Sequence, residues 1–203
     1  QGAKGFDLDL VSEVMTYNAS QGKPAYAAII NRLDRPVSGL VLIAKNKSAA
    51  AKYSTLMQKE GGFNKQYEAL ICGKLSELKG TFVDYLKKDG RTNTSAIVPA
   101  DAAANDKEAK LSKLEYEVIS YDEVKDITHV RIHLITGRHH QIRVQFASRR
   151  HPLVGDYKYA TADCGMDNAV KAVAFKRNQI ALCAVSLTVD NKTYSVAPEF
   201  SIG

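Results

Sequence analysis

Hydrophobic residues recur along the chain at two spacings, which predict both strands and helices. Residues 128–134 alternate most clearly: Val130, Ile132 and Leu134 are apolar and the residues between them are polar. This period of two is typical of a strand with one buried face. Asp9 precedes apolar residues at helical spacing and is a suitable N-cap, so a helix is expected to begin there.

Shorter patterns predict the other elements. Residues 39–44 are continuously apolar, which indicates a strand buried on both faces. Residues 99–110 have no apolar period and predict a mobile loop. Further strands are expected at residues 67–72, 81–86, 94–98, 114–119, 180–189 and 193–196, and further helices at residues 47–59 and 139–147. Many strands with few interleaved helices indicate an α+β fold around a largely antiparallel sheet.

Length and composition are those of an ordinary soluble domain. The 203 residues are 45% hydrophobic and 25% charged, enough to bury a sizeable core. We therefore expect one domain over residues 1–203, with a trimmed N-terminus because Gln1 is not a natural start. No apolar run is long enough for a membrane helix. Three cysteines without a CxxC pair favour reduced thiols and a cytoplasmic protein.

Positive charge is concentrated in two segments. The net charge is +6, which favours anionic partners such as nucleic acid. Five arginines fall within residues 131–150, and Arg32 and Arg35 lie on either side of Asp34. Arginine's planar fork suits phosphate groups and stacks on bases. Opposite charge on both sides favours the ionised form of the Asp34 carboxylate, although most Arg–Asp neighbours are ordinary exposed salt bridges.

Three sequence motifs, the first of which contains Asp34, occur in order along the chain. They are Arg32-Leu33-Asp34-Arg35-Pro36-Val37-Ser38-Gly39, Thr136-Gly137-Arg138-His139-His140-Gln141-Ile142-Arg143, and His151-Pro152-Leu153-Val154-Gly155-Asp156-Tyr157. In this order they resemble the RLDxxxSG, TGRxHQIR and HPxxGDxxY motifs of the RluA-type pseudouridine synthases. Residues 65–69 resemble that family's KxYxA strand, and residues 180–184 more weakly resemble its LHA strand. The resemblance runs from about Lys23 to the C-terminus.

The resemblance implies both a fold and an activity. The implied fold is a pseudouridine synthase catalytic domain, a long, bent, mainly antiparallel mixed sheet flanked by helices, with a central active-site cleft. The implied reaction converts uridine to pseudouridine in ribosomal or transfer RNA. Because it is an isomerisation without redox change, it needs neither a metal ion nor an organic cofactor. We expect structured RNA as the partner and a monomeric enzyme. Many relatives add a small S4-type RNA-binding domain at the N-terminus, and no such segment is present in this sequence.

The resemblance also implies site residues. Asp34 corresponds to the essential aspartate and Arg143 to the basic residue paired with it, through an Arg–carboxylate fork. Tyr67 corresponds to the aromatic residue that stacks on the target uracil, and Arg32 to an arginine that helps extrude the nucleotide. Contacts to RNA or uridine are expected from Arg35, Arg138, His140 and Leu182, although Leu182 is as suitable for a plain core position. The turn at residues 151–157 is interpreted as structural.

Some positions depart from the family pattern, and two other functions are considered. Asn31, Val37 and Cys183 replace residues common in relatives, and we expect altered packing there without loss of activity. One alternative is an RNA-binding relative that has lost turnover. The other is a metal-dependent hydrolase using the clustered histidines. This is disfavoured because a four-residue offset on a strand separates His129 from His133 by about 13 Å.

Overall fold

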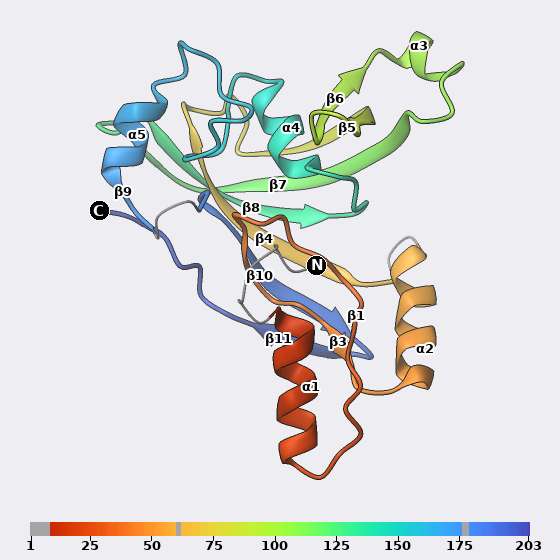
Figure 1. The fold of residues 1–203 in the computed structure, drawn as a ribbon. Coiled ribbons are helices and arrows are strands. Elements are labelled where there is room, and N and C mark those ends of the chain that lie inside the picture. Colours follow the sequence, from red (N-terminus) through yellow and green to blue (C-terminus); the bar gives the residue numbers. More distant parts are fainter. Residues whose placement is uncertain (1–8, 60–61, 176–178) are drawn as a thin grey trace. The chain divides into compact units, whose positions relative to one another are not determined.

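The computed structural model describes residues 9–59, 62–175 and 179–203 (Figure 1). By its internal contacts the chain divides into two compact units. The first comprises residues 1–33 and 41–63, and the second comprises residues 34–40 and 64–203. The single domain expected from the sequence stays a prediction.

The described residues of the first unit, 9–33, 41–59, 62 and 63, form two helices and one short strand pair. Helix α1 (Leu10–Ser20) begins at Asp9, whose carboxylate accepts a hydrogen bond from the backbone N–H of Ser12 at 2.9 Å, so the predicted N-cap is confirmed. Strands β1 (Ala28–Ile29) and β3 (Ile43–Ala44) pair antiparallel. Helix α2 (Lys47–Gln58) follows, as its Ala- and Leu-containing sequence predicts.

The second unit is built on one large sheet. Its strand order is β11-β10-β4-β8-β7-β5-β6, and the short strand β2 (Ser38–Gly39) adds to β10. The other strands are β4 (Asn64–Cys72), β5 (Lys79–Asp89), β6 (Thr94–Val98), β7 (Lys110–Asp122), β8 (Ile127–Leu134), β10 (Leu182–Val189) and β11 (Lys192–Ser195). The β2–β10 pair is parallel and the other pairs of this sheet are antiparallel. The predicted mixed, mainly antiparallel sheet is therefore confirmed.

Alternation along β8 fixes which side chains enter the core. Val130, Ile132 and Leu134 are buried, as their period of two predicts. Helix α4 (Gln141–Ala147) lies against this side of the sheet (Figure 1), where Phe146 packs edge-on against Phe82 of β5 and Tyr116 of β7. These aromatic contacts hold α4 in place over the sheet.

A second hydrophobic cluster lies under helix α5 (Met166–Ala172). It joins that helix to the ends of β4 and β10, and its buried members include Leu70, Cys72, Val154, Met166, Ala169, Ala181, Cys183 and Phe200. Strands β9 (Val173–Ala174) and β12 (Ser201–Ile202) pair beside it. The three cysteines are free. None of the helices described is long and apolar enough to cross a membrane.

Two predicted elements are wrong. Residues 39–44 do not form one strand: Gly39 ends β2, β3 begins at Ile43, and the two strands belong to different units. The apolar run is only partly buried, because each short strand has one neighbour. Residues 99–110 contain a short helix, α3 (Ala100–Ala103), instead of only a loop.

Candidate active site

The loop that carries Asp34 is anchored to the start of β10. Ser38 and Gly39 pair with Cys183 and Ala184, and the backbone N–H of Leu40 donates to the carbonyl of Ala184 at 3.0 Å. Just before them, the N–H of Val37 donates to the carbonyl of Asp34 at 2.9 Å and closes a turn. Backbone hydrogen bonds before and after Pro36 therefore fix the backbone position of Asp34, from which its side chain extends.

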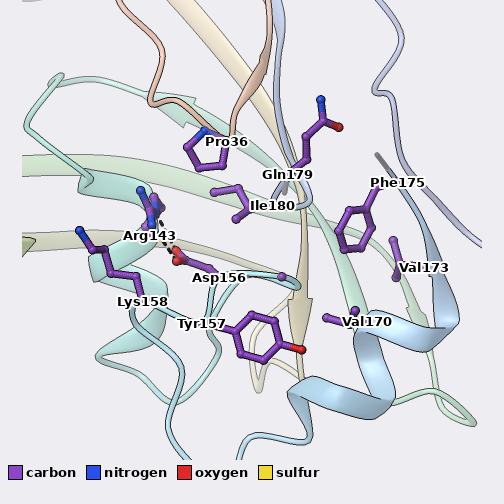
Figure 2. Close-up of a pocket in the computed structure, with 11 residues that line it drawn as sticks. Pro36, Arg143, Asp156, Tyr157, Lys158, Val170, Val173, Phe175, Gln179 and Ile180 are labelled. Atoms are coloured by element: carbon purple, nitrogen blue, oxygen red, sulfur yellow. Dashed lines mark hydrogen bonds and ion pairs between the residues drawn. The ribbon is translucent and has the colours of Figure 1, made fainter. Parts of the chain in front are cut away.

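Arg143 reaches Asp34 from helix α4. Its Nη1 lies 3.3 Å from Oδ2 of Asp34. The fork predicted for this pair is made with another carboxylate, because Nε and Nη2 of Arg143 both donate to Asp156, each at 2.7 Å (Figure 2). The bidentate partner of Arg143 is thus Asp156, whereas Asp34 accepts a single, longer hydrogen bond from it.

Asp156 was missed by sequence reasoning, which interpreted the 151–157 turn as structural. That interpretation is incomplete, since Asp156 is only 2% exposed and neutralises the buried Arg143. Burial alone lowers the pKa of Arg143, but the bonds and charge of Asp156, with the charge of Asp34, raise it above its ordinary value. A carboxylate just after the arginine-rich segment 131–150 was the available signal.

His140 approaches the same carboxylate oxygen. Its Nε2 lies 3.6 Å from Oδ2 of Asp34, and its Nδ1 lies 2.6 Å from the hydroxyl of Tyr159. Burial lowers the pKa of His140 to about 3, and the positive charge of Arg143 acts in the same direction. His140 is therefore a neutral imidazole at physiological pH.

Tyr67 and Leu182 lie on neighbouring strands and on one face of the sheet. Leu182 of β10 pairs with Ala69 of β4, and Ala69 is two residues from Tyr67, so the three side chains point to the same side. Both Tyr67 and Leu182 are buried. Burial raises the pKa of Tyr67 to about 12, and the charge of Asp34 adds to the effect. The phenol is thus neutral and near Asp34.

The predicted arginines are placed differently from one another. Arg35 is exposed in the second unit, next to Asp34, and Arg32 is exposed in the first unit. Arg138 is also exposed, and its Nε donates to the carbonyl of Leu111 at 2.9 Å. The structure brings Asp34, Arg143 and His140 together. Tyr67 is close enough for the charge of Asp34 to raise its pKa, whereas Arg138 lies at the turn before α4.

A pocket of about 550 Å³ lies beside the Arg143–Asp156 pair (Figure 2). Pro36, Phe175 and Ile180 contribute apolar walls. Among the described residues that line it, neither Asp34 nor Tyr67 nor Leu182 is found. This pocket is therefore not where those three side chains would meet a base.

Histidines and carboxylates of the second unit form pairs instead of a metal site. His129 Nε2 lies 3.1 Å from Glu68, and His133 Nδ1 lies 3.4 Å from Glu115. Over residues 9–59, 62–175 and 179–203, no group of three His, Cys, Asp or Glu side chains is arranged to hold a metal ion.

The chain is similar to known RNA pseudouridylate synthases. The family model for RNA pseudouridylate synthase matches residues 4–148, more than half of the chain. The ribosomal large subunit pseudouridine synthase D of Blochmanniella floridana is 36% identical over 135 residues, which cover 66% of this chain and 38% of that protein. Its namesake from Vibrio vulnificus is 30% identical over 177 residues, covering 86% of this chain and 51% of that protein. The chain thus spans about half or less of the length of these relatives.

Solved structures share the fold. Human RNA pseudouridylate synthase domain containing 1 superposes with a TM-score of 0.66 at 24% identity, covering 85% of this chain and 68% of that one. Human RNA pseudouridylate synthase domain containing 4 gives a TM-score of 0.69 at 16% identity, covering 90% and 75%. The α+β fold class predicted from the sequence is confirmed. With the family model matched over residues 4–148 and the RluA-type motifs in order, the chain belongs to the RNA pseudouridylate synthase family.

Proposed function

We propose that this protein converts uridine to pseudouridine in structured RNA, with Asp34 as the catalytic carboxylate. The observation that carries the proposal is the position of Asp34, held at Oδ2 by Arg143, whose own guanidinium is fixed by Asp156. Among the residues that the structure describes, Arg143 and His140 both approach Oδ2. We therefore propose that the other carboxylate oxygen of Asp34, Oδ1, is the one that faces the substrate.

The chemistry proposed for the site needs a carboxylate and an apolar surface for the base. The bond between uracil N1 and ribose C1′ breaks, the base turns over, and a bond between C5 and C1′ replaces it. The C5 proton is then lost and N1 gains a proton, so the product is an isomer. We propose that Asp34 stabilises the intermediate in which base and sugar are detached. Tyr67 would stack on the uracil, and Leu182 would form an apolar wall beside it.

The substrate is proposed from the names of relatives and from charge. Several relatives are named ribosomal large subunit pseudouridine synthases, so ribosomal RNA is the substrate we propose first, with transfer RNA second. A uridine inside a stem must be flipped out before its C5 is reached. We assign Arg32 to extruding the nucleotide and filling the vacated stack, and Arg35 to RNA contacts; both side chains are exposed.

Tritium release from RNA labelled at uridine C5 tests the proposal. Ribosomal RNA transcribed in vitro, and therefore unmodified, is incubated with the protein and with Asp34→Asn. We expect release with the natural sequence and at least ~10³-fold less with Asp34→Asn, because a neutral amide cannot stabilise the intermediate as the carboxylate does. RNA affinity should stay within a few-fold.

Asp101→Asn is the matched control, since Asp101 is an exposed carboxylate on α3. It should release tritium at the normal rate. Normal release by Asp34→Asn would remove Asp34 from the mechanism. RNA binding without release by the natural sequence would instead indicate a relative that has lost turnover.

A further inference from the structure

The hydroxyl of Tyr159 lies between a backbone donor and His140. The backbone N–H of Ser95, on β6, donates to Tyr159 Oη at 2.9 Å. The same oxygen lies 2.6 Å from Nδ1 of His140. Because an N–H can only donate, it occupies a lone pair of Tyr159 and leaves the phenol proton for Nδ1. When the phenol donates this proton across the 2.6 Å contact, Nδ1 of His140 is the acceptor.

An accepting Nδ1 determines where the hydrogen of His140 lies. A neutral imidazole carries one N–H, so the hydrogen is on Nε2 when Nδ1 accepts. Burial keeps His140 neutral, with its pKa lowered to about 3. Nε2 is the atom 3.6 Å from Oδ2 of Asp34. In this tautomer the N–H donor of His140 faces the Asp34 carboxylate.

Further contacts hold the two rings in this orientation. His139 stacks on His140 with ring centroids 3.8 Å apart, and Nδ1 of His139 lies 2.9 Å from Oγ of Ser95. The Arg143 guanidinium lies over the Tyr159 ring at 5.1 Å. Tyr159 therefore touches both of the side chains that approach Asp34.

We propose that Tyr159 is a positioning residue for Asp34: its hydroxyl, fixed by Ser95, holds neutral His140 in the tautomer whose Nε2–H faces the carboxylate. The proposal rests on the function proposed above. A neutral Nε2–H orients Asp34 by directing a donor at Oδ2. The 3.6 Å separation is longer than a hydrogen bond, and we expect it to shorten when substrate binds.

Nitrogen NMR of ¹⁵N-histidine-labelled protein tests the tautomer directly and without RNA. The ring signals of His140 are assigned by their absence in His140→Gln. We expect the Nε2–H form in the natural sequence and loss of that preference in Tyr159→Phe. Tyr157→Phe is the matched control, because its hydroxyl bonds Asp167 on the exposed surface. Hydrogen on Nδ1 in the natural sequence, or an unchanged tautomer in Tyr159→Phe, would overturn the proposal.

A double-substitution cycle tests the consequence for turnover. Tyr159→Phe should lower kcat by about tenfold with little change in KM, since it acts on the catalytic group. Gln at position 140 keeps an N–H donor but has no tautomers, so Tyr159→Phe should have almost no further effect in His140→Gln. If Tyr159→Phe lowered kcat equally in the natural sequence and in His140→Gln, Tyr159 would not act through the tautomer of His140.

Thermal unfolding of each variant identifies losses caused by misfolding. If the natural sequence had no turnover, the proposed function would fail, yet the NMR result would still decide whether Tyr159 sets the tautomer. The two failures are therefore distinguishable.

Discussion

Arg143 is shared unequally between two carboxylates. Its two bonds to Asp156 are 2.7 Å long, whereas its bond to Asp34 is 3.3 Å. The shorter, bidentate pair sets the position of the guanidinium. Asp34 therefore meets a cation that is already held in place, and a weaker bond leaves the carboxylate more available for reaction.

Asp156→Asn should impair catalysis through Arg143. The amide can accept only one of the two bonds and leaves the buried guanidinium with less compensating charge. We expect kcat to fall by about 10²-fold and the free energy of unfolding by ~1–3 kcal/mol. Tritium release and urea unfolding measure these two effects. Asp167→Asn, at an exposed carboxylate, should change neither; a normal kcat in Asp156→Asn would mean that Arg143 needs no fixed partner.

His140 should make the fold sensitive to acid. Its pKa is lowered from 6.5 to about 3 in the folded protein, first by burial and then by Arg143. Between these values the unfolded chain binds a proton at this residue and the folded chain does not. The free energy of unfolding should therefore decrease as the pH falls through this range.

Urea unfolding at about pH 7 and pH 4.5 measures that decrease. In His140→Gln the decrease should be smaller, because the titrating group is gone. His133→Gln, at a partly exposed imidazole on β8, should keep the full decrease. The same pH dependence in all three proteins would contradict a neutral buried His140.

At the scale of elements, the short strand β2 sets the position of the catalytic loop. Gly39 has φ of +119° and lies against the backbone of Ala184. A Cβ at this position would lie 2.4 Å from the Ala184 carbonyl oxygen, so a side chain would force β2 and β10 apart.

Gly39→Ala should therefore reduce stability and displace Asp34. We expect the free energy of unfolding to fall by ~1–3 kcal/mol and kcat to fall further than stability alone explains. Gly90→Ala is the matched control, since a Cβ there meets nothing within 4 Å. Tritium release and urea unfolding are the readouts. Equal behaviour of the two variants would mean that the β2–β10 pairing does not position the loop.

The sequence predicted the regular elements better than the loops between them. The alternation along β8 and the cap at Asp9 are local properties, and both predictions are confirmed. The strand predicted over residues 39–44 failed because its halves pair with different partners, which no local pattern records. Asp156 was missed for the same reason, since its role depends on Arg143 thirteen residues away. The catalytic assignment of Asp34, Arg143 and Tyr67 stays a prediction.

At the scale of the molecule, the large sheet separates two sets of side chains. Tyr67 pairs with Ile132 of β8, which pairs with Tyr116 of β7, and Tyr116 packs against α4. Glu68 follows Tyr67 on β4, and Arg131 precedes Ile132 on β8. Because side chains alternate along a strand, Glu68 and Arg131 point to the opposite face, where they form an ion pair of 3.1 Å. The proposed catalytic residues and α4 thus share one side of the sheet.

This division predicts how the basic residues contribute to RNA binding. The net charge of +6 favours RNA in general, but contacts should concentrate on the side of Asp34. Arg35→Ala should weaken RNA binding and reduce the slope of log affinity against log salt by about one, because one phosphate contact is lost. Arg131→Ala removes the same charge from the opposite face and should leave that slope unchanged. Binding titrations over a series of salt concentrations measure both slopes, and equal slopes for the two variants would show that RNA is attracted by net charge and not by the face that carries Asp34.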